Sequence, residues 1–341
     1  MASAPRHFED LPAKREATPL LVGLVGASGS GKTFSALRLA TGIQRVSGGD
    51  IFGIDTEARR MLHYSDDFKF RHLEFKAPFG SLDYLAAIEH CYAKGAKTII
   101  VDSTSHEHDG PGGVLESHES EMERLSKGNE AKRGSFTFLA WQKPKAERRR
   151  MINTILQMPV NLIFCFRAKD KMKPKGGGAS GNDPLKLGWM PIAGEEFVYE
   201  MTANVLLYPN GGGVPVWAPA ESGEKVMIKL PRQFESIFVD GEPLSEDVGE
   251  KLARWAAGGV APSVTPRPTE GLTLLEKKRA KILTARDKLG PEVFLRILGK
   301  HGATAIGEVT TVAQADAIID QLRQTLEAQA AKEARGVISS A

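Results

Sequence analysis

The chain has 341 residues, of which 41% are hydrophobic and 26% charged. This composition is ordinary for a globular protein and excludes a wholly disordered or fibrous chain, while the length allows two domains. No run approaches the roughly 18 consecutive apolar residues that span a bilayer, and the first twenty residues lack the apolar stretch of a secretory signal. We therefore expect a cytoplasmic protein without a membrane partner, located in the cytoplasm of a host cell if the gene is viral.

Two cysteines, Cys91 and Cys165, are too few for a disulfide framework or a four-cysteine zinc site. The net charge is only +3, but the positive charge is concentrated in one part of the sequence. Between Arg124 and Lys175 there are 14 basic residues against 3 acidic ones. Such a stretch is typical of a binding site for an anionic polymer.

Short apolar runs alternate with amphipathic segments in the first half of the chain, after a polar arm at 1–19. We predict strands over 20–25, 50–55, 97–101 and 160–166. We predict helices over 33–43, 81–94, 114–126 and 136–157. This alternation favours an α/β fold whose sheet is mainly parallel and covered by helices.

The second half begins with a segment rich in Gly, Lys and Pro over 169–190, which is too long for an ordinary connector. We interpret it as a functional or mobile loop. Further runs predict antiparallel strands over 203–208, 214–217 and 225–230 and a helix over 245–257. The domains are expected to be an arm (1–19), a core (20–257), a linker (258–271), a small helical domain (272–335) and a tail (336–341).

A phosphate-loop motif follows the first predicted strand and leads into the first predicted helix. It comprises Gly26, Ala27, Ser28, Gly29, Ser30, Gly31, Lys32 and Thr33, and it fits G-x-x-x-x-G-K-[ST] at every fixed position. The glycines let successive backbone N–H groups face a phosphate, and the helix N-terminus adds positive potential. We expect Lys32 to reach the β- and γ-phosphates of ATP and Thr33 to ligate Mg²⁺.

Acidic residues at the ends of two other predicted strands complete the expected site. Asp102 ends the run at 97–101 and is suited to hold Mg²⁺. Hydrolysis also requires a carboxylate that orients water, and Glu57 follows the second strand, which we expect to lie beside the phosphate-loop strand. Glu107 is a rival for this role, and a surface ion pair with Arg59 or Arg60 is an alternative for Glu57.

Several histidines and one aspartate gather after Asp102 and could suggest a metal site: His106, His108, Asp109 and His118. Their spacing matches no zinc pattern. We interpret this segment as a polar loop near the nucleotide.

Four segments carry a family resemblance: GASGSGKT at 26–33, IDTE at 54–57, TIIVDSTSHEHDGPGG at 98–113 and NLIFCFRAKDK at 161–171. Over roughly 20–230 the chain resembles RecA-type P-loop ATPases, in particular the phage-encoded RecA-like proteins of single-strand annealing and recombination. The resemblance implies that Glu57 is catalytic and that Tyr64 stacks on adenine. Where that family usually has a γ-phosphate-sensing glutamine, this chain has Arg167, so Arg167 or Lys169 contacts either phosphate or DNA.

The same resemblance places two DNA-binding loops within 106–140 and 169–190. The candidate DNA-binding residues are Lys143, Lys145, Arg148, Arg149, Arg150, Lys169, Lys171, Lys173 and Lys175. For the charged helix, a merely solvated face is the alternative. Phe136, Phe138 and Trp141 are candidates for base stacking, with core packing as the alternative.

The expected function is that of a DNA-stimulated ATP hydrolase that binds single-stranded DNA and promotes strand annealing or pairing. Its cofactors are ATP and Mg²⁺, and it is expected to form a homo-oligomer, either a filament or a ring. A single-strand-binding protein is a candidate further partner, and the C-terminal helical segment has no assigned role. The alternatives are a P-loop motor or loader accessory in phage DNA replication or packaging, and a nucleotide-gated DNA-binding adaptor with little turnover.

Overall fold

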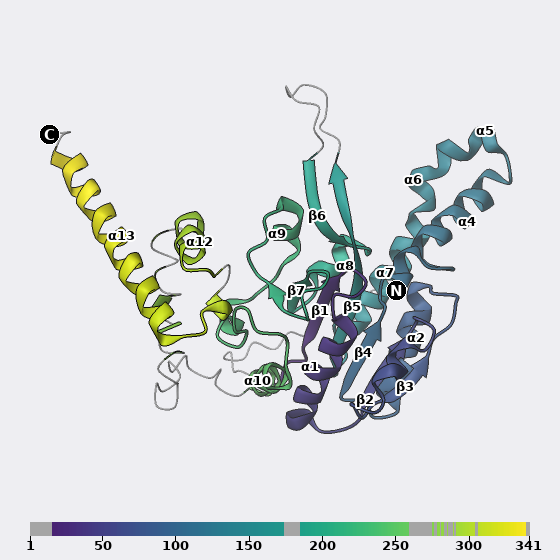
Figure 1. Cartoon of the computed structure of the whole chain (residues 1–341). Coiled ribbons are helices and arrows are strands. Elements are labelled where there is room, and N and C mark those ends of the chain that lie inside the picture. Colours follow the sequence, from purple (N-terminus) through teal and green to yellow (C-terminus); the bar gives the residue numbers. More distant parts are fainter. Residues whose placement is uncertain are drawn as a thin grey trace, which may run out of the picture. The chain divides into compact units, whose positions relative to one another are not determined.

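The computed structural model (Figure 1) describes residues 16–173, 185–258, 275, 278, 279, 281, 282, 285, 289, 291–303 and 306–338. The chain forms two compact units, 1–263 and 264–341, which we describe separately. Residues 1–15 of the expected arm, nearly all of the expected linker and residues 339–341 of the tail lie outside the described part. No helix within the described residues is both long enough and apolar enough to cross a membrane.

An eight-stranded sheet forms the centre of the first unit, in the order β3-β2-β4-β5-β1-β7-β8, with β6 paired to β5. The parallel strands are β1 (Leu21–Gly26), β2 (Ile51–Asp55), β3 (Arg71–Glu74), β4 (Thr98–Asp102), β5 (Asn161–Lys173) and β7 (Ala203–Leu207). Two strands pair antiparallel, β6 (Leu185–Pro191) and β8 (Pro215–Val216). The predicted α/β fold with a mainly parallel sheet is confirmed.

The strand order corrects one expectation. β1 lies between β5 and β7, so β2 is not beside the phosphate-loop strand, and β4 and β5 separate the two. The strands β1, β2, β4 and β7 are buried along their whole length and carry apolar residues on both faces. Such continuous apolar runs reveal that a strand is central but not which strand is its neighbour.

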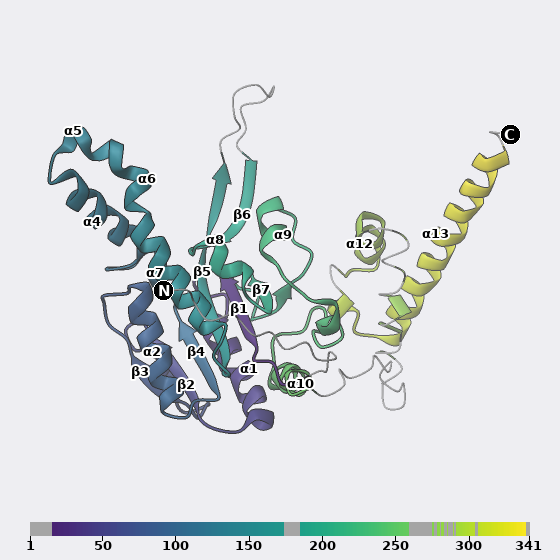
Figure 2. The same ribbon diagram turned by 180° about the vertical axis from the view of Figure 1, so that it is seen from behind.

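Helices cover both faces of the sheet (Figure 2). On one face α1 (Lys32–Ser47) and α10 (Glu246–Ala256) share a core with β1, and on the other face α2 (Ser81–Ala93) and α7 (Gln142–Ile155) share a second core. α1 and α10 approach closely because Gly42 and Gly249 face the partner backbone. An added Cβ would lie 1.9 Å from the Glu246 carbonyl oxygen at Gly42 and 2.2 Å from the Leu39 carbonyl oxygen at Gly249.

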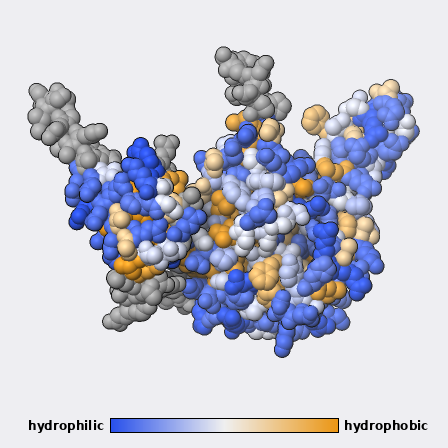
Figure 3. All heavy atoms as spheres, viewed as in Figure 1, coloured by the Kyte–Doolittle hydropathy of each residue, from blue (hydrophilic) through white to orange (hydrophobic). Residues whose placement is uncertain are grey.

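Short helices occupy the connections of the first unit. They are η1 (Arg60–Tyr64), α3 (His106–Asp109), α4 (Val114–Ser126), α5 (Glu130–Arg133), η2 (Gly134–Phe136), α6 (Thr137–Ala140), α8 (Glu195–Tyr199), α9 (Ser222–Met227) and η3 (Arg232–Phe234). Figure 1 shows that α4, α5 and α6 form a helical projection that extends from the body beyond the sheet. Hydrophilic side chains cover most of the face in Figure 3, and hydrophobic ones are scattered in small groups.

Several predicted elements differ in the structure. The strand expected to be antiparallel at 203–208 is β7, which pairs parallel to β1. The helix expected over 136–157 is divided among η2, α6 and α7. The first half of the expected strand at 225–230 is helical and belongs to α9, and in the second half only Lys229 forms a bridge, to Asn204. Tertiary contacts decide this conformation: Glu224 accepts hydrogen bonds from the Trp189 amide and the Tyr208 hydroxyl, which fixes the helix against β6. Such contacts override local strand propensity.

The expected loop at 169–190 is instead the base of a β-ribbon. β5 continues to Lys173 and pairs antiparallel with β6, which begins at Leu185. The ribbon projects past the rest of the sheet in Figures 1 and 2. Residues 174–184 between the two strands, including Lys175, lie outside the described part of the chain.

The second unit is helical in its described part. It contains α12 (Pro291–Lys300), η4 (Ile306–Glu308) and α13 (Val312–Ile338). Its own core includes Ile282, Phe294, Leu298, Ile318 and Leu322. The unit therefore has a hydrophobic core separate from the two that flank the sheet.

Candidate active site

The phosphate loop connects β1 to α1 at the carboxyl edge of the sheet. Its tight path depends on Gly29 and Gly31, whose φ angles of 76° and 90° lie in the left-handed region. Lys32 begins α1, and its ammonium group donates hydrogen bonds to the carbonyl oxygens of Gly26 (2.9 Å) and Ala27 (2.8 Å). The amino end of α1 and the lysine thus concentrate positive charge at one point, as a phosphate site requires.

A cavity of about 440 Å³ opens in front of this loop. It is lined by Ser28, Gly29, Gly31, Lys32, Thr33, Thr56, Glu57, Ala58, Arg60, His63, Tyr64, Asp102, His106 and Arg167. The cavity therefore brings together predicted residues from four separate segments. The sequence predicted no individual role for Thr56, Ala58 or His63, and it placed His106 only in a polar loop near the nucleotide.

Thr33 and Asp102 form the candidate magnesium site. The Thr33 hydroxyl donates a hydrogen bond of 2.5 Å to Oδ2 of Asp102. Asp102 is 6% exposed, and burial raises the pKa of its carboxyl group to about 6, against the opposing effect of the Thr33 hydrogen bond. A hydroxyl and a carboxylate oxygen are ligands that suit Mg²⁺, which completes its coordination with phosphates and water. These two residues would hold the ion, which neutralises charge on the phosphates when bound.

Asp55, at the end of β2, shapes the loop that carries Glu57. Its buried carboxylate accepts hydrogen bonds from the backbone amides of Glu57 (2.8 Å) and Met61 (3.0 Å) and contacts Nε2 of His72 at 3.1 Å. The chain turns sharply between the two amides, because Ala58 has a φ of 53° and the next residue a φ of 68°. The loop thereby turns Glu57 toward the phosphate loop, although β2 is not adjacent to β1.

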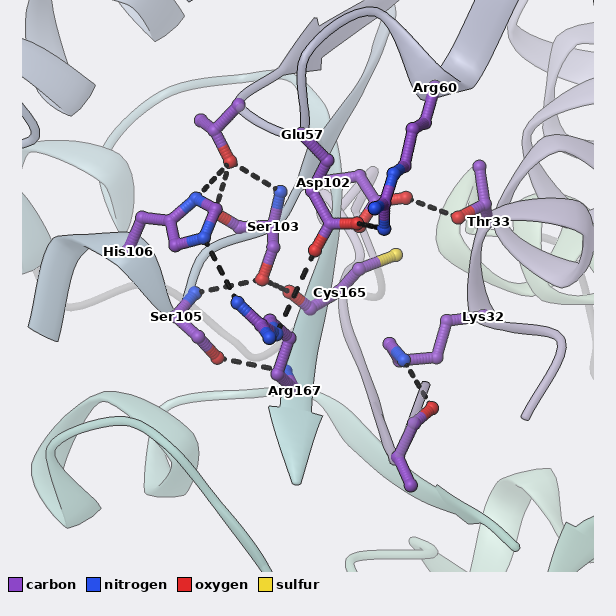
Figure 4. A network of polar contacts seen from close by, with 12 residues as sticks. Lys32, Thr33, Glu57, Arg60, Asp102, Ser103, Ser105, His106, Cys165 and Arg167 are labelled. Atoms are coloured by element: carbon purple, nitrogen blue, oxygen red, sulfur yellow. Dashed lines mark hydrogen bonds and ion pairs between the residues drawn. The ribbon is translucent and has the colours of Figure 1, made fainter. Parts of the chain in front are cut away.

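The side chain of Glu57 lines the cavity and lies between two arginines. Its carboxylate is 3.4 Å from the Arg60 guanidinium and 3.9 Å from that of Arg167. The expected alternative of an ion pair with Arg60 is therefore present, but it does not remove Glu57 from the cavity (Figure 4). Glu107, the rival general base, is instead 1% exposed and bonds to Ser81 and Arg148. It does not line the cavity.

Tyr64 ends η1 and lies at the rim of the cavity, where the resemblance implied contact with adenine. Its ring packs against Phe34 of α1 with the centroids 5.9 Å apart. Tyr64 is half-buried.

Arg167 lies on β5, which continues from there into the ribbon. Figure 4 shows its side chain beside those of Glu57 and His106. Its backbone amide donates to the Ser105 hydroxyl (2.8 Å), and its guanidinium lies 3.2 Å from Nε2 of His106. His106 in turn contacts Thr56, whose hydroxyl is 2.8 Å from Nδ1. Residues of β5, α3 and the Glu57 loop thus form one polar network.

The structure corrects the prediction for Arg148. Its side chain is buried, and its guanidinium forms a two-point ion pair with Glu107 at 3.0 and 2.7 Å and a further contact with Glu196 at 3.3 Å. Burial is the largest single effect and lowers the pKa of Arg148, but the hydrogen bonds and charges of Glu107 and Glu196 together outweigh it and raise the pKa. Arg148 therefore joins α3, α7 and α8 internally and does not present its charge to a ligand at the surface.

Acidic residues of α4 neutralise part of the basic stretch. Lys143 is 3.3 Å from Glu121, which also pairs with Arg124. Arg133 pairs with Glu119 and, at 3.3 Å, with Glu130. The charge imbalance read from the sequence between 124 and 175 is therefore smaller in space, because α4 supplies carboxylates that precede this stretch.

The other predicted cations of α7 are exposed. Arg149 and Arg150 have no ion pair among the described residues, and the Lys145 ammonium lies 5.7 Å from the centre of the Trp141 ring. Trp141 itself stacks on His118 with the centroids 4.0 Å apart. Phe138 is 92% exposed, so core packing does not account for it.

Lys169, Lys171 and Lys173 alternate along β5, so their side chains leave the ribbon on one face. None of the three has an ion pair within the described residues. The predicted extended arrangement of these lysines is therefore found in a strand rather than a loop. The pKa of His108 on α3 is lowered, mainly by burial and by the charge of Arg148. The charge of Lys171 makes a smaller contribution in the same direction.

Comparison with protein families gives one match. Residues 18–201, more than half of the chain, match a family described as an AAA domain. The match covers the phosphate loop, Glu57, Asp102, Arg167 and both strands of the ribbon. A search of curated proteins finds no match for the chain.

Proposed function

Because the chain belongs to this AAA-domain family of P-loop NTPases, we propose that it hydrolyses ATP with Mg²⁺, binds single-stranded DNA and promotes strand annealing or pairing. In this proposal it is RecA-like, as the motifs from 26 to 171 indicate, and it acts as a filament or ring of identical subunits. The family membership itself indicates a nucleotide-dependent activity, and the DNA-directed function goes beyond it.

The observation that carries the proposal is the course of β5. The strand places Arg167 in the cavity, 3.9 Å from Glu57, and two residues later begins the row formed by Lys169, Lys171 and Lys173. A single strand therefore connects the candidate γ-phosphate contact to a row of unpaired cations. Such a row suits a polyanion, because phosphate contacts dominate the affinity for nucleic acid.

The proposed roles follow from chemistry at the cavity. Lys32 and the backbone of the phosphate loop bind the phosphates, and Thr33 and Asp102 hold Mg²⁺. The Glu57 carboxylate orients the attacking water and accepts its proton. Arg167 contacts the terminal phosphate, in place of the glutamine of the resembling family.

The first test measures ATP hydrolysis with and without single-stranded DNA. We expect DNA to stimulate the wild-type rate and Lys32→Ala to abolish nucleotide binding. Glu57→Gln should still bind ATP but lose turnover by about 100-fold or more, because a positioned base contributes roughly that factor. A Glu57→Gln variant that hydrolyses ATP at the normal rate would exclude Glu57 as the base.

The second test measures DNA affinity as a function of salt. Replacing Lys169, Lys171 and Lys173 by Ala should weaken binding and reduce the slope of log affinity against log salt by about 2, since each single-strand phosphate contact contributes about 0.7. The matched control replaces Lys69, Lys94 and Lys97, which lie at the amino-terminal edge of the sheet and change the net charge equally. Equal effects of the two triple variants would show that only net charge matters.

An annealing assay with bare complementary strands, added to these two tests, discriminates the alternatives. A motor or loader accessory would hydrolyse ATP without annealing bare complementary strands. An adaptor would bind ATP and DNA with negligible turnover.

A further inference from the structure

His106 is the first residue of α3 and is held on three sides. Nδ1 lies 2.8 Å from the Thr56 hydroxyl, Nε2 lies 3.2 Å from the Arg167 guanidinium, and the ring stacks on Phe79 with the centroids 5.2 Å apart. It also lines the cavity. The side chain is therefore fixed in orientation between Thr56, which precedes Glu57, and Arg167.

The hydrogen bonds determine which ring nitrogen carries the proton. A guanidinium can only donate, so Nε2 of His106 must accept from Arg167, and the proton of the neutral ring lies on Nδ1. The Thr56 hydroxyl then accepts from Nδ1 and from the Ser103 amide (2.8 Å), and it donates to the Ser103 carbonyl oxygen (3.0 Å). The single proton and both lone pairs of the Thr56 hydroxyl are then used, which leaves one consistent arrangement.

The surrounding charges favour the neutral ring. Burial and, secondly, the Arg167 guanidinium lower the pKa of His106, against the weaker opposing effects of Glu57 and Asp109. A protonated ring would direct an Nε2 proton at Arg167 and break the contact.

We propose that His106, held as the Nδ1–H tautomer by Thr56, is the positioning residue that directs Arg167 toward the terminal phosphate of ATP. This inference rests on the proposed nucleotide chemistry of the site but not on the DNA-directed function. His106 supplies a lone pair that fixes one end of the guanidinium while the other end faces Glu57. In this proposal Arg167 contacts only the third phosphate, so its positioning by His106 favours nucleoside triphosphates over diphosphates.

The test compares the affinities for the Mg²⁺ complexes of adenylyl imidodiphosphate and ADP by titration calorimetry, without DNA. The preference for the triphosphate analogue over ADP should fall about three- to tenfold in His106→Ala and at least as much in Arg167→Ala. The double variant should be no weaker than Arg167→Ala alone. His90→Ala, an exposed histidine on α2, is the matched control and should retain the wild-type preference.

Two further variants separate positioning from folding. Thr56→Val keeps the size of the side chain but removes the acceptor for Nδ1, so it should lower the triphosphate preference, whereas Thr56→Ser should retain it. ¹⁵N NMR of the histidine rings should show the Nδ1–H tautomer for the signal that His106→Ala removes.

Three results would overturn the inference: an unchanged preference in His106→Ala, additive losses in the double variant, or an Nε2–H tautomer. Because DNA is absent from this assay, a failure of DNA stimulation would leave the result on His106 unaffected. The failure of the proposed DNA function and the failure of this inference are therefore distinguishable.

Discussion

At the scale of single residues, the site places ionisable groups where burial opposes their charge. Asp102 and Lys32 are both buried beside the phosphate loop. Burial is the largest effect that raises the pKa of Asp102, and the nearby Glu57 and Asp55 carboxylates raise it further. The hydrogen bond from Thr33 and the charge of Lys32 lower the pKa of Asp102. A bound Mg²⁺ would compensate the negative charge of this carboxylate. Without Mg²⁺, the buried charge of Asp102 destabilises the folded protein.

Asp102→Asn should therefore stabilise the protein in the absence of nucleotide and Mg²⁺. The pKa of Asp102 is raised from 3.8 to about 6 on folding, so the folded state retains a proton that the unfolded state loses as pH rises from about 4 to 6. Stability is lost over this window, and above it the variant should exceed wild type in free energy of unfolding by at most about 3 kcal/mol. Urea unfolding between pH 4 and 8 measures the difference.

The exposed Asp66→Asn removes the same charge, serves as the control for Asp102→Asn and should not raise the free energy of unfolding. The stabilised variant should also lose Mg²⁺-dependent nucleotide binding. A difference between Asp102→Asn and wild type that is the same at pH 4 and pH 8 would contradict the proposed cause.

At the scale of elements, the ribbon of β5 and β6 is fixed at its base by α9. The pairing shifts register between Lys171 and Met172, and Gly188 opposite this point has a φ of 79°. The Glu224 carboxylate lies against Gly188 and accepts hydrogen bonds of 2.8 Å from the Trp189 amide and the Tyr208 hydroxyl. The direction in which the ribbon projects thus depends on a buried carboxylate that packs on a glycine.

Gly188→Ala should disturb this base. The new Cβ would lie 2.5 Å from the Glu224 carboxyl group, and alanine is strained at a positive φ. We expect a loss of about 2 kcal/mol or more in the free energy of unfolding, together with weaker DNA binding and unchanged ATP binding. Gly134→Ala is the control, because its φ is −58° and its added Cβ meets no atom within 4 Å. Equal stability of the two variants would exclude the packing role of Gly188.

The elements that the sequence predicted well are those with a strong local signal. The buried strands β1, β2 and β4 have continuous apolar runs, and α4 begins and ends where its pattern indicated. β3 was missed because it is a short edge strand, Arg71–Glu74, without a buried residue. The ribbon was read as a loop because its lysines and glycines are typical of loops, while its strand conformation depends on pairing between β5 and β6.

Spatial order was the other part that the sequence did not contain. Residues at the ends of parallel strands meet at one edge of the sheet, so Thr33, Glu57 and Asp102 could be grouped without knowing the strand order. The burial of Arg148 could not be predicted from its place on a charged helix. It depends on an ion pair with Glu107 of α3, which is 41 residues earlier in the chain. The segment of His106 was expected near the nucleotide, but its contacts with Thr56 and Arg167 depend on the same spatial order.

At the scale of the whole molecule, the two units have separate hydrophobic cores, and the nucleotide cavity belongs entirely to the first. We expect calorimetry to resolve two unfolding transitions. A triphosphate analogue with Mg²⁺ at about 100 times its dissociation constant contributes about 2.7 kcal/mol to the unit that binds it, which should raise that transition by about 5–10 °C. Lys32→Ala should abolish the shift. If both transitions rise together, the units unfold as one, and the second unit takes part in the stability of the nucleotide site.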